Sequence, residues 1–265
     1  GLIETTDHAV EIARQIGYPV MIKASAGGGG KGIRVAHSDA DMAEGFAAVK
    51  AEAQTAFGDD RVFLEKFIVN PRHIEIQVLG DKHGNIVSLF DRECSIQRRN
   101  QKVVERAPAP YLTDEQRAEV CGLALKIGQA VGYQNAGTVE FLMDMDRQQF
   151  YFIEVNPRVQ VEHTVTEEVT GIDIVQAQIK IAEGATLAEA TGEPDQAHIT
   201  LSGHAVQCRV TTEDPQNNFI PDYGRITAYR SATGMGIRLD GGNAFTGSVI
   251  TPYYDSLLVK ATTWG

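Results

Sequence analysis

The polar residues between positions 154 and 163 are the strongest candidates for chemistry in this chain. In the segment EVNPRVQVEH, every second position is polar: Glu154, Asn156, Arg158, Gln160 and Glu162. In an extended chain successive side chains alternate, so these five groups would point to one side. Asn is depleted in strands and Pro157 removes a ladder N–H. The pattern therefore favours a strand ending at a ligand site over a polar edge strand with paired charges.

The first residues of this segment suit a metal ion. Glu154 and Asn156 offer hard oxygen ligands, which Mg²⁺ shared with nucleotide phosphates prefers. Glu140 lies on the neighbouring strand of a predicted hairpin and would face Glu154 across it. Two carboxylates this close need a cation between them, or one takes up a proton.

The last residues of the segment suit a small anion and a base. Arg158 and Gln160 offer donors for a planar oxyanion, and Glu162 is the candidate base beside them. At ~3.3 Å per strand residue, Glu162 would lie roughly 26 Å from Glu154 if the chain were extended. We therefore predict a bend between Pro157 and Gln160 that brings both carboxylates to one cleft.

A glycine run at 27–32 indicates a phosphate-binding flap. The run GGGGKG satisfies G-x-G-x-x-G, but residues 33–36 read as a strand and not as the helix of a dinucleotide site. A P-loop needs Ser or Thr where Gly32 stands, and the kinase motifs HRD and DFG are absent. Backbone N–H groups of Gly28, Gly29 and Gly30 could close over phosphates, with Lys23 reaching the same group. A surface hairpin is the alternative.

The elements that would position these residues indicate an α+β fold. Apolar spacing, caps and glycine stops predict helices at 6–16 (capped by Thr6), 39–57, 114–131 and 173–182. Strands are predicted at 19–24, 33–36, 62–67, 72–79, 86–95, 137–145, 149–155, 205–211, 225–230 and 257–261. In 72–79, His73, Glu75 and Gln77 share one face, and Ile74, Ile76 and Val78 share the other. We expect three parts: 1–67, 68–200 and an incomplete β-rich part, 201–265.

Composition excludes several partners. The formal charge of -11 argues against nucleic acid, and no apolar run approaches the ~18 residues of a membrane span. Basic residues at 92–102 (Arg92, Arg98, Arg99 and Lys102) would form a local positive patch. Three well-separated cysteines are expected to be buried, reduced thiols.

Five segments together resemble the biotin carboxylases of the ATP-grasp fold. They are KASAGGGGKG (23–32), EK (65–66), RHIE (72–75), ECSIQRRNQK (93–102) and EVNPRVQVEH (154–163). The resemblance covers nearly the whole chain. It implies an ATP-grasp fold with a small lid lobe, followed by a truncated biotin carboxylase C-terminal domain. Within the family, residues 101–112 and 209–225 look most like pyruvate carboxylases, with acetyl-CoA and propionyl-CoA carboxylases as near alternatives.

The resemblance also implies roles for individual residues. The nucleotide site would comprise Lys23, Gly28, Gly29, Gly30, Glu65, Lys66, His73 and Gln97. The metal ligands would be Glu140, Glu154 and Asn156, and the bicarbonate site Lys102, Arg158, Gln160 and the backbone of Val161. Glu162 would deprotonate bicarbonate, and Arg209 would stabilise the biotin enolate. Asn100 stands where some relatives have His, which leaves that nucleotide contact open.

The activity implied is carboxylation of biotin by ATP and bicarbonate with Mg²⁺ or Mn²⁺. Biotin would be carried on another domain, and the complete enzyme, which in the family also has an N-terminal α/β domain, would be a homo-oligomer. Pyruvate would be the final acceptor, giving oxaloacetate. We expect a cytoplasmic protein, with the mitochondrial matrix as the alternative. A carbamoyl-phosphate synthetase half and a non-catalytic nucleotide-binding fragment are the competing interpretations.

Overall fold

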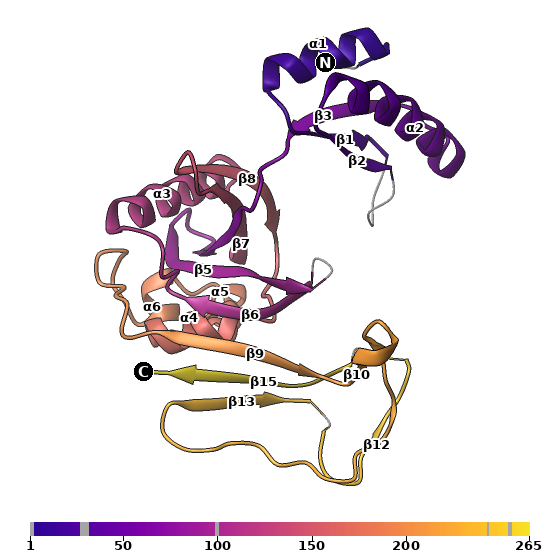
Figure 1. Cartoon of the computed structure of the whole chain (residues 1–265). Coiled ribbons are helices and arrows are strands. Elements are labelled where there is room, and N and C mark those ends of the chain that lie inside the picture. The colour runs from indigo at the N-terminus through magenta and orange to yellow at the C-terminus, as the bar shows by residue number, and fades with distance from the viewer. Residues whose placement is uncertain (1–2, 27–31, 99–100, 243, 254–255) are drawn as a thin grey trace. The chain divides into compact units, whose positions relative to one another are not determined.

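The computed structural model describes residues 3–26, 32–98, 101–242, 244–253 and 256–265 (Figure 1). It confirms a mixed helix and strand fold. The chain divides into two compact units, Gly1–Asn70 and Pro71–Gly265. The last predicted part, from residue 201, contributes strands to the same sheet as the residues before it. The two units are described separately.

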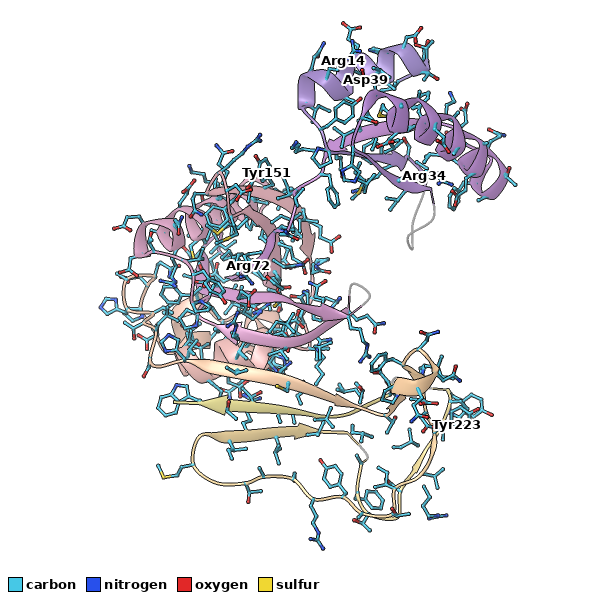
Figure 2. The ribbon with its side chains drawn as sticks, viewed as in Figure 1. Arg14, Arg34, Asp39, Arg72, Tyr151 and Tyr223 are labelled. Carbon is cyan, nitrogen blue, oxygen red and sulfur yellow. The ribbon has the colours of Figure 1, made fainter. Side chains whose placement is uncertain are left out.

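The first unit is a small sheet with two helices. Its elements are α1 (Thr6–Ile16), β1 (Val20–Ala24), β2 (Ile33–Ala36), α2 (Asp39–Phe57) and β3 (Val62–Lys66), with strand order β2-β1-β3. The side chain of Thr5, not of Thr6 as predicted, caps α1, because Thr6 is already helical. The ion pair of Arg14 with Asp39, at 2.5 Å, links α1 to the start of α2 (Figure 2).

The second unit is built on an eight-stranded antiparallel sheet of order β13-β15-β9-β6-β5-β4-β7-β8. The strands are β4 (Arg72–Gly80), β5 (Ile86–Arg98), β6 (Gln101–Ala107), β7 (Asn135–Asp144), β8 (Gln149–Asn156), β9 (Ala205–Thr211), β13 (Ile237–Gly241) and β15 (Leu257–Trp264). Figure 1 shows β9, β15 and β13 running side by side. The sequence predicted neither β6 nor β13. The strand predicted at 225–230 is wrong beyond Arg225, where the two-residue β12 (Gly224–Arg225) ends.

Short elements fill the connection between β9 and β15. They are β10 (Glu213–Asp214), a 3₁₀ turn (Pro215–Asn217), β11 (Ile220–Pro221), β12 and β14 (Val249–Ile250). β10 pairs with β11, and β12 pairs with β14.

Helices cover both faces of the large sheet. On one face α3 (Asp114–Ala130) packs its Val120 and Ala124 against Ile74 and Ile76 of β4. Thr113 and Gln116 form the predicted capping box at the start of α3. On the other face lie α4 (His163–Thr170), α5 (Ile174–Glu183) and α6 (Leu187–Thr191). Because β4 alternates, the side chains of Glu75 and Gln77 share one face, as the sequence predicted, and on that face both accept hydrogen bonds from Arg92, which also bonds Thr166 of α4.

Among the described residues, no helix is both long and apolar enough to cross a membrane. The three cysteines are free thiols. Cys94 is buried as expected, but Cys121 is only partly buried and Cys208 is exposed. Cys208 lies in the middle of β9, and its side chain points away from the face on which the neighbouring Gln207 bonds Thr164 of α4.

Candidate active site

A row of charged residues crosses the large sheet. Arg92 on β5 pairs in register with Glu75 on β4, Glu75 with Glu140 on β7, and Glu140 with Glu154 on β8. The predicted pairing of Glu140 with Glu154 across a hairpin is therefore confirmed. Like charges on directly opposed residues repel, so three adjacent carboxylates require positive charge close by. We call Arg92, Glu75, Glu140 and Glu154 the charged row.

Lys102 supplies part of that positive charge. From β6 its ammonium pairs with Glu75, with Glu140 at 3.0 Å and with Glu162 at 2.7 Å. Acidic partners compensate three of the four cations predicted to form a positive patch at 92–102, and the fourth, Arg99, lies outside the described residues. Lys102 faces three carboxylates and Arg92 is fully buried against Glu75. Arg98 pairs with Glu213.

Glu140 receives hydrogen bonds from four side chains. Its partners are Nε2 of His73, Nζ of Lys102, Nδ2 of Asn156 and Nε2 of Gln160, each at 3.0 Å. Burial would raise the pKa of Glu140, but the His73 hydrogen bond and the Lys102 charge outweigh it and hold the pKa at about 2. Gln97 in turn contacts Nδ1 of His73 at 3.1 Å, so two predicted nucleotide-site residues lie together.

The predicted metal ligands fit a hard divalent cation. Asn156 donates through Nδ2 to Glu140 at 3.0 Å and to Glu154 at 3.2 Å, which brings the three side chains together. Rotation of the Asn156 amide by half a turn would present its oxygen beside the two carboxylates. Carboxylate and amide oxygens are the ligands that Mg²⁺ takes in proteins.

The chain bends after the metal ligands, as predicted. Strand β8 ends at Asn156, an irregular turn follows, and α4 begins at His163. The bend brings the second-unit residues predicted for the site to one cavity of about 900 Å³. They are His73, Gln97, Lys102, Glu140, Glu154, Asn156, Arg158, Gln160, Val161, Glu162 and Arg209. Glu154 and Glu162 therefore share a cleft.

Glu162 lies between two cations at this cavity. Its oxygens accept hydrogen bonds from Lys102 at 2.7 Å and from Nη2 of Arg209 at 2.8 Å. Burial would raise the pKa of Glu162, but the charges of Arg92 and Lys102 lower it overall. Arg209 also binds the buried Glu105 at 2.7 Å, and burial raises the pKa of that carboxyl.

A lysine side chain also holds the backbone of the residue before Glu162 in place. Lys260 on β15 donates to the carbonyl of Val161 at 3.0 Å. Arg158, at the bend, is more exposed and donates to the carbonyl of Val159 at 3.3 Å. The guanidinium of Arg98 lies 4.2 Å from the ring centroid of Phe219, and Phe219 contributes to the cavity wall.

In the first unit, only some of the residues predicted for the nucleotide site belong to the described residues. Lys23 on β1 forms an ion pair with Glu65 on β3. Lys66 donates to the carbonyls of Gly17 at 2.6 Å and Tyr18 at 3.0 Å. The predicted flap residues Gly28, Gly29 and Gly30 lie outside the described residues. Nucleotide roles for these residues stay predictions.

Several residues that hold this site together were not among the site residues predicted from the sequence. Glu75, Arg92, Glu105 and Gln207 are all fully buried. Glu75 and Arg92 contact each other, as do Glu105 and Gln207. Glu75 lay within the alternating segment 72–79, where a carboxylate at a position facing the core signals a buried partner.

Comparison with known proteins gives two family matches. Residues 1–190 match the family "Carbamoyl-phosphate synthase L chain, ATP binding domain", and residues 207–265 match "Biotin carboxylase C-terminal domain".

Individual relatives are similar over the whole chain. It is 55% identical to pyruvate carboxylase of Bacillus subtilis over 265 residues, which is 100% of this chain and 23% of the relative. It is 58% identical to pyruvate carboxylase 1 of Caenorhabditis elegans, covering 98% of this chain and 22% of the relative. The chain thus spans less than a quarter of the length of these relatives.

Solved structures of pyruvate carboxylase and of a related carboxylase are also similar to the whole chain. A structure of Rhizobium etli pyruvate carboxylase with acetyl coenzyme-A matches with a TM-score of 0.86 and 62% identity, over 100% of this chain and 24% of that one. The biotin carboxylase domain dimer of Hydrogenobacter thermophilus 2-oxoglutarate carboxylase, in complex with MgADP, ADP and bicarbonate, matches with a TM-score of 0.85 and 47% identity. That match covers 100% of this chain and 57% of the other.

Proposed function

Because the chain belongs to the biotin carboxylase family, with matches to its ATP-binding domain and to its C-terminal domain, we propose that it carboxylates biotin with ATP and bicarbonate as part of a pyruvate carboxylase. The observation that carries this proposal is the cavity in which Lys102, Glu162 and Arg209 meet the charged row. The similar domain with MgADP and bicarbonate supports the choice of substrates.

The first half-reaction activates bicarbonate. Arg158, Gln160 and the backbone of Val161 bind it, and Lys102 adds a positive charge beside Glu162. Glu162 takes the bicarbonate proton, and the resulting dianion attacks the γ-phosphorus of ATP to give carboxyphosphate and ADP. Glu140, Glu154 and Asn156 would hold Mg²⁺ or Mn²⁺, which when bound neutralises charge on the transferring phosphoryl group. Lys23 is assigned to the same phosphates.

The second half-reaction carboxylates biotin. Carboxyphosphate splits into CO₂ and phosphate, and the phosphate takes the ureido N–H proton. Arg209 stabilises the biotin enolate, whose nitrogen then attacks CO₂. The pairing of Arg209 with Glu162 and Glu105 supports this role, because CO₂ would be released beside the proposed base. Biotin would arrive on a carrier domain, and the whole protein would be a homo-oligomer.

ATP cleavage by the complete protein tests this proposal. We expect ATP cleavage that requires Mg²⁺ and bicarbonate together and that increases when free biotin is added. Carboxyl transfer to pyruvate, with 2-oxoglutarate as the competing acceptor, tests the assignment to pyruvate carboxylase. ATP cleavage that ignores biotin would contradict it and favour another ATP-grasp ligase.

Arg209→Ala should separate the two half-reactions. We expect most carboxybiotin formation to be lost, while part of the bicarbonate-dependent ATP cleavage remains, because Glu162 keeps its bond to Lys102. The fold should tolerate the change, since Glu105 retains Gln207 at 2.9 Å. Quantifying both activities on the same preparation measures the separation.

The matched control is Arg106→Ala, which breaks the contact of Arg106 with the buried Glu93 at 2.6 Å on the same sheet. We expect this control to lower the two activities together if it lowers either. If Arg209→Ala behaves in the same way and also unfolds, Arg209 is a structural ion-pair residue.

A further inference from the structure

Arg92 is a fully buried guanidinium at the end of the charged row. It makes six hydrogen bonds from all three of its nitrogens. Its acceptors are Glu75 and Gln77 on β4, Thr138 on β7, Gln160 in the bend and Thr166 on α4. A buried charge is tolerated when it is paired and hydrogen-bonded, and here the pairing joins the sheet, the bend and α4.

The contact with Gln160 fixes the direction of its amide. An arginine can only donate, so the group 3.1 Å from Nη2 of Arg92 must be the Gln160 oxygen. A carboxylate can only accept, so the group 3.0 Å from Glu140 must be the Gln160 nitrogen. Gln160 therefore presents an N–H donor at the cavity, which is what an anion requires.

The contact with Glu75 fixes Lys102 as well. Arg92 occupies Oε2 of Glu75, at 3.2 and 3.3 Å, while Lys102 contacts Oε1 of the same carboxylate. Because Arg92 neutralises one oxygen of Glu75, Lys102 does not bind Glu75 alone and also contacts Glu140 and Glu162. The charge of Arg92 also contributes to the lowered pKa of Glu162, against the effect of burial.

We propose that Arg92 is a positioning residue for bicarbonate: through Gln160 and Glu75 it orients the amide donor and the lysine that bind the anion, without touching the anion itself. The inference rests on the proposed function and adds a residue to it. It predicts that loss of this geometry weakens bicarbonate binding selectively, whereas nucleotide binding is retained.

Arg92→Lys tests the proposal in the complete protein, because lysine keeps the charge but cannot make the forked contacts. We expect KM for bicarbonate to rise about tenfold or more, the scale of losing a charge-assisted hydrogen bond, with KM for MgATP within about twofold of wild type. The matched control is Arg117→Lys, a partly buried arginine bonded to the buried Asp91 at 2.7 Å, which should leave both KM values unchanged. A parallel rise in both KM values for Arg92→Lys would overturn the proposal.

A double-mutant cycle with Gln160→Met shows whether Arg92 acts through Gln160. In the Gln160→Met background, Arg92→Lys should raise KM for bicarbonate much less than in wild type. Fully additive effects would overturn the proposed route through Gln160.

Thr166→Val keeps the test decisive if Arg92→Lys does not fold. It removes one acceptor of Arg92, at 3.1 Å, with little change of shape. A rise of about threefold in KM for bicarbonate alone supports the proposal, a smaller effect than for Arg92→Lys because Nη1 of Arg92 keeps its bond to Gln77, and an unchanged value contradicts it. The wild type is measured first. If its ATP cleavage does not depend on bicarbonate, the proposed function fails, whatever the variants do.

Discussion

Glu162→Gln is expected to lower bicarbonate-dependent ATP cleavage by about 10²–10⁴, the usual contribution of a positioned general base. Affinity for MgATP should stay near wild type, because the Glu162 carboxylate is assigned to proton transfer and not to the metal. The fold should survive, since each cation that Glu162 contacts has another partner. Lys102 keeps Glu75 and Glu140, and Arg209 keeps Glu105.

The charges around Glu162 are expected to make its pKa depend on whether bicarbonate is bound. The lowered pKa of Glu162 keeps it ionised before bicarbonate binds, although burial acts in the opposite direction. Bicarbonate at its proposed site would add a negative charge and compete for the N–H groups of Lys102 and Arg209. Both effects would raise the pKa of Glu162 towards the value that proton abstraction near neutral pH favours.

Turnover of Glu162→Gln and its affinity for MgATP should be measured together. The matched control is Glu93→Gln, a fully buried glutamate on β5 that binds Arg106 at 2.6 Å. We expect cleavage by this control to stay within about threefold of wild type, because Glu93 is not among the residues that line the cavity. Unchanged cleavage by Glu162→Gln, or lost nucleotide affinity, would contradict the role of base.

Local sequence signals predicted most elements of this fold. The capping box of Thr113 and Gln116 and the Ser38 cap place the starts of α3 and α2 correctly. Period-two alternation predicted both faces of β4, and the strand spacing predicted the bend before Glu162. These signals depend on neighbours in the sequence, which one chain displays directly.

The partners of the charged groups could not be predicted in the same way. The sequence placed Arg92 and Lys102 in a positive patch, because their compensating carboxylates on Glu75, Glu140 and Glu162 lie 17 to 60 residues away in the sequence. β6 was missed because QKVVERA (101–107) is charged at its start and shows no clean alternation. α4 was missed because the alternating polar pattern that precedes it continued to His163. Tertiary pairing, not local propensity, decides these elements.

Replacing the proposed metal ligands should have the second large effect. Glu154→Gln is expected to cut Mg²⁺-dependent ATP cleavage by at least about a hundredfold, the scale of losing one preorganised charge stabiliser. Glu154 is exposed and its carboxylate contacts Asn156 at 3.2 Å, so the substitution should barely change stability. If the loss comes from the metal, raising the Mg²⁺ concentration should restore part of the cleavage.

Glu140→Gln should reduce cleavage at least as much, but for more than one reason. Glu140 also accepts hydrogen bonds from His73, Lys102 and Gln160, so its replacement disturbs the bicarbonate end of the cavity as well as the metal. We therefore expect KM for bicarbonate to rise for Glu140→Gln and to stay nearly unchanged for Glu154→Gln. Excess Mg²⁺ should rescue Glu140→Gln less than Glu154→Gln, since added metal does not return the lost acceptor. Turnover at increasing Mg²⁺, with Glu93→Gln as the control, measures this difference. Wild-type turnover in both variants would rule out the metal assignment, because two charged ligands cannot both be dispensable for holding a divalent cation.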